Sequence, residues 1–418
     1  MPNKVVVVGQ GYVGLPVAIR AVEVGYDVVG VDVDARRVGE LRAGQSYVDD
    51  IADDQLVAAH ASGRYLPTTS YEDAHNFDLA VITVPTPLRD AMPDLSFIEL
   101  AAQSLAPGMA AGATVILEST TYPGTTEELL APLLEEGSGL VCGSDFFVGY
   151  SPERIDPGNK KWGFRETPKV VSGLGPEALE RVRAFYASLV DEVVVVSGPK
   201  EAELTKLLEN TFRHVNIALV NELLVFGNQL GVDVWEAIDA AATKPFGFMK
   251  FTPGPGVGGH CLPVDPSYLS WQVRRKLGRS FRFVELANDV NDHMPDYVVA
   301  RIITALNKRK LALNGASILL LGLAYKKNTG DIRESPSLRI LSLLEEYGAR
   351  LSAVDRHVES YQWPAIATRV DLTVETVASS DLILVVADHD DVDYALLDPA
   401  LARVFDTRGF IKGAGEVL

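Results

Sequence analysis

The sequence predicts an α/β protein in which two doubly wound lobes are joined by a central helical domain with a long helix. Three observations predict it. A β-branched strand runs into a glycine-rich turn at Lys4–Gly14, one helical pattern holds from Glu201 to Leu230, and strand–helix alternation resumes after Gly315. A chain of 418 residues is also too long for one ordinary core. We therefore expect three domains, at residues 1–198, 199–310 and 311–418.

The first strand and turn read Lys-Val-Val-Val-Val-Gly-Gln-Gly-Tyr-Val-Gly. A helical pattern follows over Pro16–Gly25, and a second strand over Asp27–Val33 contains Asp32 near its end. Strand, glycine turn, helix, strand and acid in this order are the dinucleotide-binding fingerprint of a Rossmann-like lobe. We expect Asp32 to accept hydrogen bonds from ribose hydroxyls and to repel a 2′-phosphate, so the predicted cofactor is NAD rather than NADP.

The three glycines of this turn have separate expected roles. Gly9 makes the tight turn, Gly11 lets a pyrophosphate approach the backbone, and Gly14 lets the helix pack on the strand. The pyrophosphate would lie at the helix N-terminus, where unpaired N–H groups favour an anion.

Three further strands of the first lobe each run into a polar loop. They are predicted at Phe77–Val84, Ala113–Leu117 and Phe146–Val148. Ligands bind beyond the carboxyl ends of parallel strands, so these loops should line one cleft. Turn chemistry explains the prolines and glycines of the loops. It explains Glu118 and Glu153 less well, because both would lie at a cofactor-facing edge.

The long central helix carries two rows of side chains. The apolar row keeps a spacing of three and four residues; it consists of Leu204, Leu208, Phe212, Val215, Leu219, Leu223, Phe226 and Leu230. The opposite row consists of Lys206, Asn210, Arg213 and Asn221. A solvated helix face usually mixes glutamates with lysines, whereas this row holds only cations and amides. We interpret it as hydrogen-bond donors that point into a site, with an ordinary wet helix face as the alternative.

A stretch rich in glycine and proline, Gly254–Pro266, presents Cys261, one of two cysteines in the chain. Glycine permits turns with positive φ and proline fixes them, so the stretch predicts a rigid loop rather than a helix or strand. Asp265 follows the cysteine by four residues. We interpret Cys261 as a nucleophile; the alternative is an inert thiol that packs as a small apolar group. His260 precedes it and is a candidate base for the thiol, but chain neighbours seldom face each other, so whether it assists Cys261 stays open.

The end of the chain repeats the strand–helix pattern. The strand Ser317–Leu321 opens it, and cations stand at the loop ends: Lys326, Arg333 and Arg408. The cluster Asp388–Asp391 includes a histidine, but no second ligand group has metal-site spacing, so we predict a solvated loop and no metal. Before this lobe, a second long helix over Val284–Lys308 is of the kind that packs against another copy, so we expect a homodimer.

Composition restricts the partners and the compartment. A formal charge of −18 argues against nucleic acid or an anionic membrane as a partner, although a few local cations can still hold a small anion. No stretch approaches the about 20 apolar residues of a membrane span, and the run Val5–Val8 is too short for a signal peptide. Two cysteines make no disulfide framework. We expect a cytoplasmic protein.

The whole chain resembles the nucleoside-diphosphate-sugar 6-dehydrogenase family. The matching segments follow the family's order; they are Gly9–Gly14, Val84–Pro87, Ser119–Thr120, Ser151–Glu153, Lys206 with Asn210, Gly258–Asp265 and Lys326–Pro336. Members of this family oxidise the C6 hydroxymethyl group of a UDP-sugar to a carboxylate, a four-electron reaction that uses two NAD and one water. The resemblance implies this activity, with NAD as cofactor and a UDP-sugar as substrate.

The resemblance also implies the catalytic roles. Cys261 would form a thiohemiacetal with the aldehyde and, after the second hydride loss, a thioester. Lys206 and Asn210 would stabilise the oxyanion, where one donor is typically worth about 3 kcal/mol. Glu153 would be the general base for the hydrolytic water, and we expect burial to raise its pKa toward working pH. Two residues would assist it: Thr120 and Asp265.

Ligand contacts follow from the same resemblance. The residues expected at the cofactor are Gly9, Gly11, Tyr12, Val13, Gly14, Asp32, Arg37, Val84, Pro85, Thr86, Ser119, Thr120, Glu153 and Arg333. Those expected at the substrate are Glu153, Arg154, Lys206, Asn210, Arg213, Phe248, Gly258, Lys326 and Arg408. The last lobe would bind the UDP half, and the loop Lys244–Lys250 would lie over the sugar.

Within the family, the sequence departs from the UDP-glucose branch at two positions. That branch has a lysine where this chain has Val264, and a second glutamate where this chain has Pro157. Three segments look closer to the UDP-N-acetylglucosamine branch: Glu118–Thr126, Ser151–Gly158 and Gly254–Pro266. We expect a UDP-N-acetylglucosamine 6-dehydrogenase, with the UDP-glucose and UDP-N-acetylmannosamine enzymes as alternatives. A two-electron dehydrogenase that needs no cysteine and a non-catalytic nucleotide-binding protein also stay open.

Overall fold

The computed structural model describes residues 4–48, 50–89, 92–155, 161–259 and 261–418, with the backbone alone at Cys261. The chain separates into two compact units, Met1–Glu209 and Asn210–Leu418. Pro157 and His260, both considered above, lie outside the described residues. The three predicted domains, and the two boundaries between them, stay predictions.

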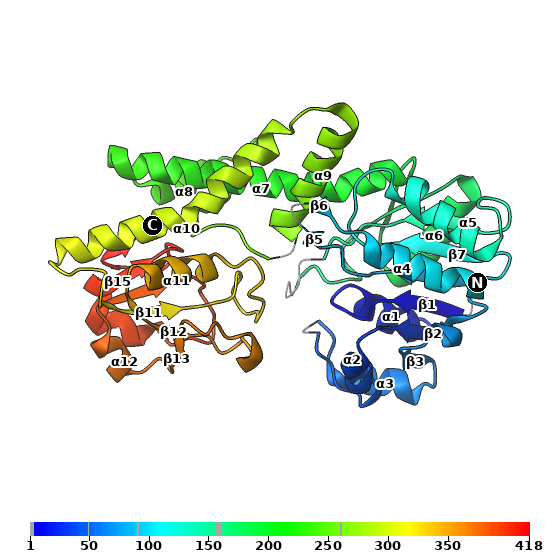
Figure 1. Ribbon diagram of the computed structural model, residues 1–418, viewed down its shortest axis with the longest axis horizontal. Helices are drawn as coiled ribbons and strands as arrows, with labels where there is room; N and C mark the ends of the chain where they lie inside the picture. The colour runs from blue at the N-terminus through cyan, green and yellow to red at the C-terminus, as the bar shows by residue number, and fades with distance from the viewer. Residues whose placement is uncertain (1–3, 49, 90–91, 156–160, 260) are drawn as a thin grey trace. The chain divides into compact units, whose positions relative to one another are not determined.

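The first unit is built on an eight-stranded sheet with the order β10-β9-β8-β7-β4-β1-β2-β3. Figure 1 labels β1, β2, β3 and β7 of this sheet. Its parallel strands are β1 (Lys4–Val8), β2 (Asp27–Val31), β3 (Tyr65–Thr68), β4 (Leu79–Ile82), β7 (Thr114–Leu117) and β8 (Phe147–Tyr150). These strands have the order of a dinucleotide-binding fold. The sheet then reverses, because β9 (Lys169–Gly173) is antiparallel to β8, and β10 (Val193–Val195) is parallel to β9. A small hairpin pairs β5 (Leu88–Arg89) with β6 (Met92–Pro93).

Helices cover this sheet and supply its core. The α-helices are α1 (Gly14–Glu23), α2 (Ala35–Arg42), α3 (Asp53–Ala61), α4 (Ser96–Leu105), α5 (Ala131–Ser138) and α6 (Pro176–Leu189). Short turns of other helix types are η1 (Tyr71–Ala74), η2 (Ala106–Gly108) and η3 (Thr126–Leu130). The apolar stripes of α1 and α6 pack in one cluster with β1 and β2, through side chains such as Ile19, Phe185 and Val28. Pro176 opens α6, where a missing N–H costs no hydrogen bond.

The second unit contains a six-stranded parallel sheet with the order β13-β12-β11-β14-β15-β16. Its strands are β11 (Ser317–Leu321), β12 (Arg350–Val354), β13 (Thr368–Arg369), β14 (Leu382–Val385), β15 (Val404–Asp406) and β16 (Glu416–Val417). Its helices are α11 (Pro336–Glu346), α12 (Val374–Ser379), η4 (Ser360–Gln362) and η5 (Tyr394–Arg403). In sequence order the strands follow the same topology as the parallel strands of the first unit, so the predicted fold class is confirmed.

Four helices lie between the two sheets in the sequence: α7 (Pro199–Leu230), α8 (Val234–Ala242), α9 (Cys261–Leu277) and α10 (Arg282–Lys308). The prediction of a loop over Gly254–Pro266 is wrong from Cys261 onward, because α9 begins there. Pro263 lies in the first turn, where backbone N–H groups have no partner within the helix. Pro266 lies deeper and removes one helical hydrogen bond. Among the described residues, no helix is both long and apolar enough to cross a bilayer.

Close packing of α6 on β9 explains why Gly173 is glycine. A Cβ at this position would lie 2.2 Å from the backbone nitrogen of Leu179 in α6. Backbone cannot yield as a flexible side chain can, so we expect Gly173→Ala to destabilise the first unit by about 2 kcal/mol or more.

Urea unfolding followed by circular dichroism measures this change. Gly39→Ala is the matched control, because Gly39 lies inside the exposed helix α2 and its Cβ would meet nothing within 4 Å. That control should stabilise the protein by about 0.5–1 kcal/mol. An unfolding midpoint of Gly173→Ala at or above that of the unaltered protein would contradict the packing described here.

Candidate active site

The turn after β1 requires glycine at two positions. Gly9 has φ +90°, and its Cβ would lie 2.8 Å from the carbonyl oxygen of Thr83. A Cβ at Gly14 would lie 1.9 Å from the carbonyl oxygen of Gly9, so the turn itself requires this glycine. A Cβ at Gly11 would meet nothing within 4 Å. Among the described residues, none fills the space that a side chain at Gly11 would take, so the role predicted for this glycine stays open.

Asp32 follows β2 and is buried beside this turn. Its Oδ2 accepts the Gln10 N–H at 2.8 Å, and its Oδ1 accepts the Asp34 N–H at 2.9 Å. A carboxylate oxygen can accept two hydrogen bonds, so both oxygens keep capacity for a ligand. Arg37 Nη1 lies 3.9 Å from Oδ2. This arrangement can hold ribose hydroxyls.

The loops after β4 and β7 lie together at the same edge of the sheet. Ser119 Oγ donates to the carbonyl oxygen of Val84 at 2.7 Å, and Ser119 N–H donates to that of Ile82 at 3.1 Å. Thr86 and Thr120 are buried nearby in these loops, whereas Pro85 is exposed. Around the glycine turn, Tyr12 is 48% exposed and Val13 is the N-cap of α1.

Two carboxylates meet one lysine beyond β7 and β8. Lys169 Nζ pairs with Glu118 Oε1 and lies 3.1 Å from Glu153 Oε2. Tyr186 of α6 donates its hydroxyl proton to Glu118 Oε2 at 2.8 Å. Glu153 Oε1 also accepts the N–H groups of Arg154 and Ile155, each at 2.6 Å. We call Glu118, Lys169 and Glu153 the carboxylate cluster.

The carboxylate cluster separates the two glutamate pKa values. Burial raises the pKa of Glu118 to about 7; Lys169 opposes this shift and Glu153 adds to it. Burial alone would also raise the pKa of Glu153. However, the Lys169 charge and hydrogen bonds to Glu118 and the Ile155 N–H outweigh burial and lower the pKa of Glu153 to about 2. The expectation that burial raises the pKa of Glu153 is therefore wrong, and Glu118 has the raised value instead.

Two further glutamates fasten the start of α7 to loops of the first unit. Glu203 accepts the Gly124 N–H at 2.6 Å and the Thr126 hydroxyl at 2.7 Å, and burial raises the pKa of Glu203 to about 7. Glu209 forms a two-point ion pair with Arg154, at 2.7 and 3.3 Å. Arg154, expected at the substrate, therefore directs its guanidinium to α7 and to the carbonyl oxygen of Pro168.

Helix α7 buries Lys206 and Asn221 of its polar row and exposes most of its apolar row. Lys206 is 7% exposed and has no hydrogen bond or ion pair with any other residue that the structure describes. Asn221 is fully buried, whereas Arg213 is exposed. Asn210 Nδ2 donates to Asp265 Oδ2 at 2.6 Å, and Asp265 is fully buried one helical turn after Cys261 on α9.

The glycine-rich stretch before α9 is packed against the 325–336 loop. A Cβ would lie 2.6 Å from Tyr325 Cβ if placed on Gly258, and 2.7 Å from the Tyr325 ring if placed on Gly259. Gly259 N–H donates to the carbonyl oxygen of Arg333 at 2.9 Å. At its start, the stretch is held by Asn221, whose Oδ1 accepts the Gly254 N–H at 2.9 Å.

The other predicted ligand contacts of the second unit are distributed over several loops. Arg408 Nε donates to the carbonyl oxygen of Val386 at 2.6 Å. Arg333 pairs with Asp331 at 2.7 Å. Lys326 is half-buried and Phe248 is 41% exposed. The structure brings Arg408 within reach of the glycine-rich stretch, since a Cβ on Gly254 would lie 3.2 Å from Arg408 Nη1.

Asp355 follows β12 as Asp32 follows β2, but its carboxylate is occupied. Oδ2 accepts the N–H groups of Leu323 and Ala324 at 2.7 and 3.1 Å, and Oδ1 accepts that of His357 at 2.9 Å. His389 Nε2 lies 3.1 Å from the same Oδ2. Groups of the chain itself therefore occupy the acceptor positions of the Asp355 carboxylate.

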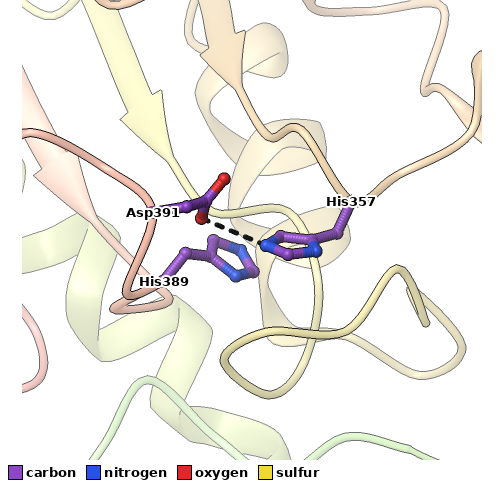
Figure 2. Close-up of side chains that lie close together, drawn as sticks. All are labelled: His357, His389 and Asp391. Carbon is purple, nitrogen blue, oxygen red and sulfur yellow. Dashed lines mark hydrogen bonds and ion pairs between the residues drawn. The ribbon is translucent and has the colours of Figure 1, made fainter. Parts of the chain in front are cut away.

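Figure 2 shows His357, His389 and Asp391 close together, a grouping that could hold a metal by distance alone. His357 Nε2 lies 3.1 Å from Asp391 Oδ1. However, His389 Nδ1 accepts the Asn328 N–H at 2.9 Å and its Nε2 faces Asp355. Both ring nitrogens of His389 are engaged, so this histidine would have to break a hydrogen bond to ligate a cation.

Three buried polar residues of the first unit, Lys169, Tyr186 and Glu203, were not predicted from the sequence. Lys169 begins an apolar strand, where a lysine ordinarily marks an exposed strand end, so no local signal distinguishes it. Glu203 and Tyr186 lie at buried helix positions among apolar residues. A polar residue on the apolar face of a helix is a usable signal for buried hydrogen bonding.

Comparison with known proteins gives consistent matches along the chain. Three segments match the UDP-glucose/GDP-mannose dehydrogenase family: its NAD binding domain over residues 3–190, its central domain over 200–293 and its UDP binding domain over 319–413. UDP-N-acetyl-D-glucosamine 6-dehydrogenase of Pseudomonas aeruginosa is 39% identical, covering 85% of this chain and 83% of that protein. NDP-N-acetyl-D-galactosaminuronic acid dehydrogenase of Ralstonia solanacearum is 35% identical, covering 96% of this chain and 95% of that protein.

A third relative is matched in sequence and structure. UDP-N-acetyl-D-mannosamine dehydrogenase of Pyrococcus horikoshii is 36% identical, covering 98% of this chain and 96% of that protein. A solved structure of the UDP-D-ManNAc dehydrogenase from this organism superposes with a TM-score of 0.89 at 34% identity, covering 98% of this chain and 96% of that chain.

Asp32 provides a test of cofactor recognition. Asp32→Ala removes the acceptor for the ribose and releases Arg37, which can then pair with a 2′-phosphate. Because a hydrogen bond to a charged group is worth about 1.5–3 kcal/mol, we expect NAD affinity to fall roughly tenfold to a hundredfold and the preference over NADP to narrow. Calorimetric titration with both dinucleotides measures this.

The control for this test is Asp27→Ala, which removes an exposed acid at the other end of β2, paired with Arg64 at 3.1 Å. It should leave both affinities unchanged. Unchanged selectivity in Asp32→Ala would show that another residue distinguishes the ribose.

Proposed function

We propose a function from one established premise: this chain belongs to the UDP-glucose/GDP-mannose dehydrogenase family, and its predicted cofactor, NAD, is confirmed. The proposed reaction oxidises the C6 hydroxymethyl group of a UDP-sugar to a carboxylate, with two NAD reduced and one water consumed. The observation that carries the proposal is the 2.6 Å hydrogen bond from Asn210 to Asp265. It ties the helix that carries Lys206 to the helix that begins at Cys261.

The proposed chemistry needs each of these groups. Cys261 would add to the aldehyde formed by the first hydride loss, because a second hydride can leave only from a tetrahedral carbon. Lys206, nearly buried yet without a partner among the described residues, would donate to the oxyanion together with Asn210. Glu153 would accept the proton of the water that hydrolyses the thioester. Lys326 and Arg408 would bind the UDP pyrophosphate.

For the sugar, we propose UDP-N-acetylglucosamine. The three relatives described above are all named for N-acetylated sugars, which supports a 2-acetamido substrate. UDP-N-acetylmannosamine is a second candidate, favoured by the TM-score of 0.89 with the Pyrococcus horikoshii enzyme. A single pocket contact worth about 1–3 kcal/mol separates such substrates.

We also propose that the apolar row of α7 is the face of a homodimer. Its exposed members are Leu204, Leu208, Phe212, Leu219, Leu223, Phe226 and Leu230, and Leu208 and Leu230 are 62% and 78% exposed. A continuous apolar stripe of this length, exposed in a single chain, is typical of a surface that is buried against another protein chain.

The four-electron reaction predicts two NADH for each sugar oxidised. Absorbance at 340 nm, with the product quantified by mass spectrometry, measures this ratio over a panel of UDP-sugars with and without the 2-acetamido group. Cys261→Ala should abolish formation of the acid, whereas Cys142→Ala, at the other cysteine, should not. A ratio of one, or unchanged acid formation by Cys261→Ala, would indicate a two-electron dehydrogenase.

Dimer formation is tested by charge on the apolar row. The double variant Leu208→Glu/Leu223→Glu places two carboxylates in the proposed interface, so sedimentation should give the mass of one chain, 45.2 kDa, instead of twice that value. Leu100→Glu, at a leucine of α4 that is 58% exposed, should stay dimeric. A variant that sediments as the unaltered protein would exclude this face.

A further inference from the structure

We propose that the carboxylate cluster is a proton relay in which Glu153 takes the proton of the hydrolytic water and Glu118 stores it, with Lys169 passing it between them. This inference rests on the proposed function, because it concerns hydrolysis of the thioester. It assigns a positioning and proton-holding role to Glu118 and Lys169, neither of which has a role in the reaction proposed above.

Burial orders the members of the relay from the surface inward. The side chain of Glu153 is 8% exposed, that of Lys169 is 4% exposed, and that of Glu118 is fully buried. Glu153 is therefore the carboxylate that water can reach. Lys169 Nζ contacts both carboxylates, and Tyr186 closes the inner end with a 2.8 Å hydrogen bond to Glu118. The hydrogen-bonded path is continuous from the water-accessible carboxylate to the buried one.

Charge explains why the proton ends on Glu118. The carboxylate cluster holds two carboxylates against one ammonium, so it has a net charge of −1 and room for one proton. Two backbone N–H groups and Lys169 stabilise the anion of Glu153, whereas Glu118 receives Lys169 and the Tyr186 hydroxyl in a fully buried position. Among the described residues, the uncharged rings of Phe164 and Tyr186 also face the lysine, at 5.5 and 5.2 Å from Nζ.

The pKa values agree with this direction. With a pKa lowered to about 2, Glu153 alone is a weak base for water, since a base works best with a pKa near the operating pH. Coupled to Glu118, whose pKa burial raises to about 7, the pair accepts one proton at neutral pH. The relay thus reconciles a carboxylate locked in its charged form with a role in proton abstraction.

The step balances without an oxidant or reductant. As one O–H bond of water breaks, its oxygen bonds to the thioester carbon and the proton moves to Glu153. Lys169 gives a proton to Glu118 and takes the one on Glu153. The C–S bond then breaks and the thiolate of Cys261 leaves with the electron pair. The acid product ionises, and Glu118 returns its proton to solvent by the same path before the next cycle.

Glu118→Gln tests the relay with little change of shape. The glutamine oxygen can still accept from Lys169, and its amide can donate to the Tyr186 oxygen, so we expect the variant to fold. Both hydride transfers precede hydrolysis. Stopped-flow absorbance should therefore show a burst of two NADH per subunit at the unaltered rate, followed by turnover slowed roughly a hundredfold. Mass spectrometry of the quenched enzyme should show the sugar thioester.

Two further variants separate the relay from a structural ion pair. Glu203→Gln changes another buried glutamate with a raised pKa that has no hydrogen bond to the carboxylate cluster, and it should produce no burst. Tyr186→Phe keeps all three charges but removes a donor to the Glu118 anion, which raises the pKa of Glu118. Because the relay is full when Glu118 is protonated, turnover should fall below about pH 7 in the unaltered enzyme. In Tyr186→Phe this fall should move to higher pH.

The outcomes are distinguishable. If Glu118→Gln slows the burst and the turnover equally, or accumulates no adduct, the relay is overturned while the proposed function stands. If Glu118→Gln does not fold, an unshifted pH profile of Tyr186→Phe overturns it in the same way. If the unaltered chain forms no NADH with any UDP-sugar, the proposed function fails and the relay fails with it.

Discussion

A lysine ammonium buried between two carboxylates is the interaction that holds together the polar edge of the first sheet. Breaking such a pair on one side typically costs about 3–5 kcal/mol, because a charge remains buried without a partner. The reversed strand β9 makes the contact. Tyr150 of β8 pairs with Ser172, and continuing this antiparallel register places Lys169 opposite Glu153. If β9 ran parallel to β8, its last residue, Gly173, would lie at this edge of the sheet. Because β9 is antiparallel, its first residue, Lys169, lies there instead and supplies the cation.

In the second unit, side-chain amides anchor the start of the glycine-rich stretch. Asn221 donates to Asn291 Oδ1 at 3.0 Å and accepts from Gly254, while His214 Nε2 pairs with Asn288 Oδ1 at 2.8 Å. Burial lowers the pKa of His214, so this network is uncharged at neutral pH. Neutral groups hold their geometry over a wide pH range. The stretch that leads to Cys261 is thus anchored at Gly254 by an uncharged contact.

Sequence patterns predicted the local features of this protein well and the long-range ones poorly. Strands such as β11 and the glycine turn at Gly9–Gly14 were predictable because steric demands act over a few residues. The start of α9 was not predictable, because proline is common both in the first turn of a helix and in loops, so a proline-rich segment does not distinguish the two. Periodicity separated the two faces of α7 but could not indicate which one is buried. Lys169 finds its partners 16 and 51 residues away, beyond any local pattern.

The second sheet repeats the order of the parallel strands of the first, but the two differ at the aspartate that follows the second strand of each. Asp32 keeps acceptor capacity on both oxygens, whereas Asp355 is filled by backbone amides and His389. One copy of this strand order, in the second unit, is thus closed to a ligand at its aspartate, and the other copy, in the first unit, is open to one. The closed copy is structurally self-sufficient at this corner when empty. In the open copy each oxygen of Asp32 holds a single backbone N–H, so a nucleotide bound as proposed would supply there the contacts that the closed copy makes by itself.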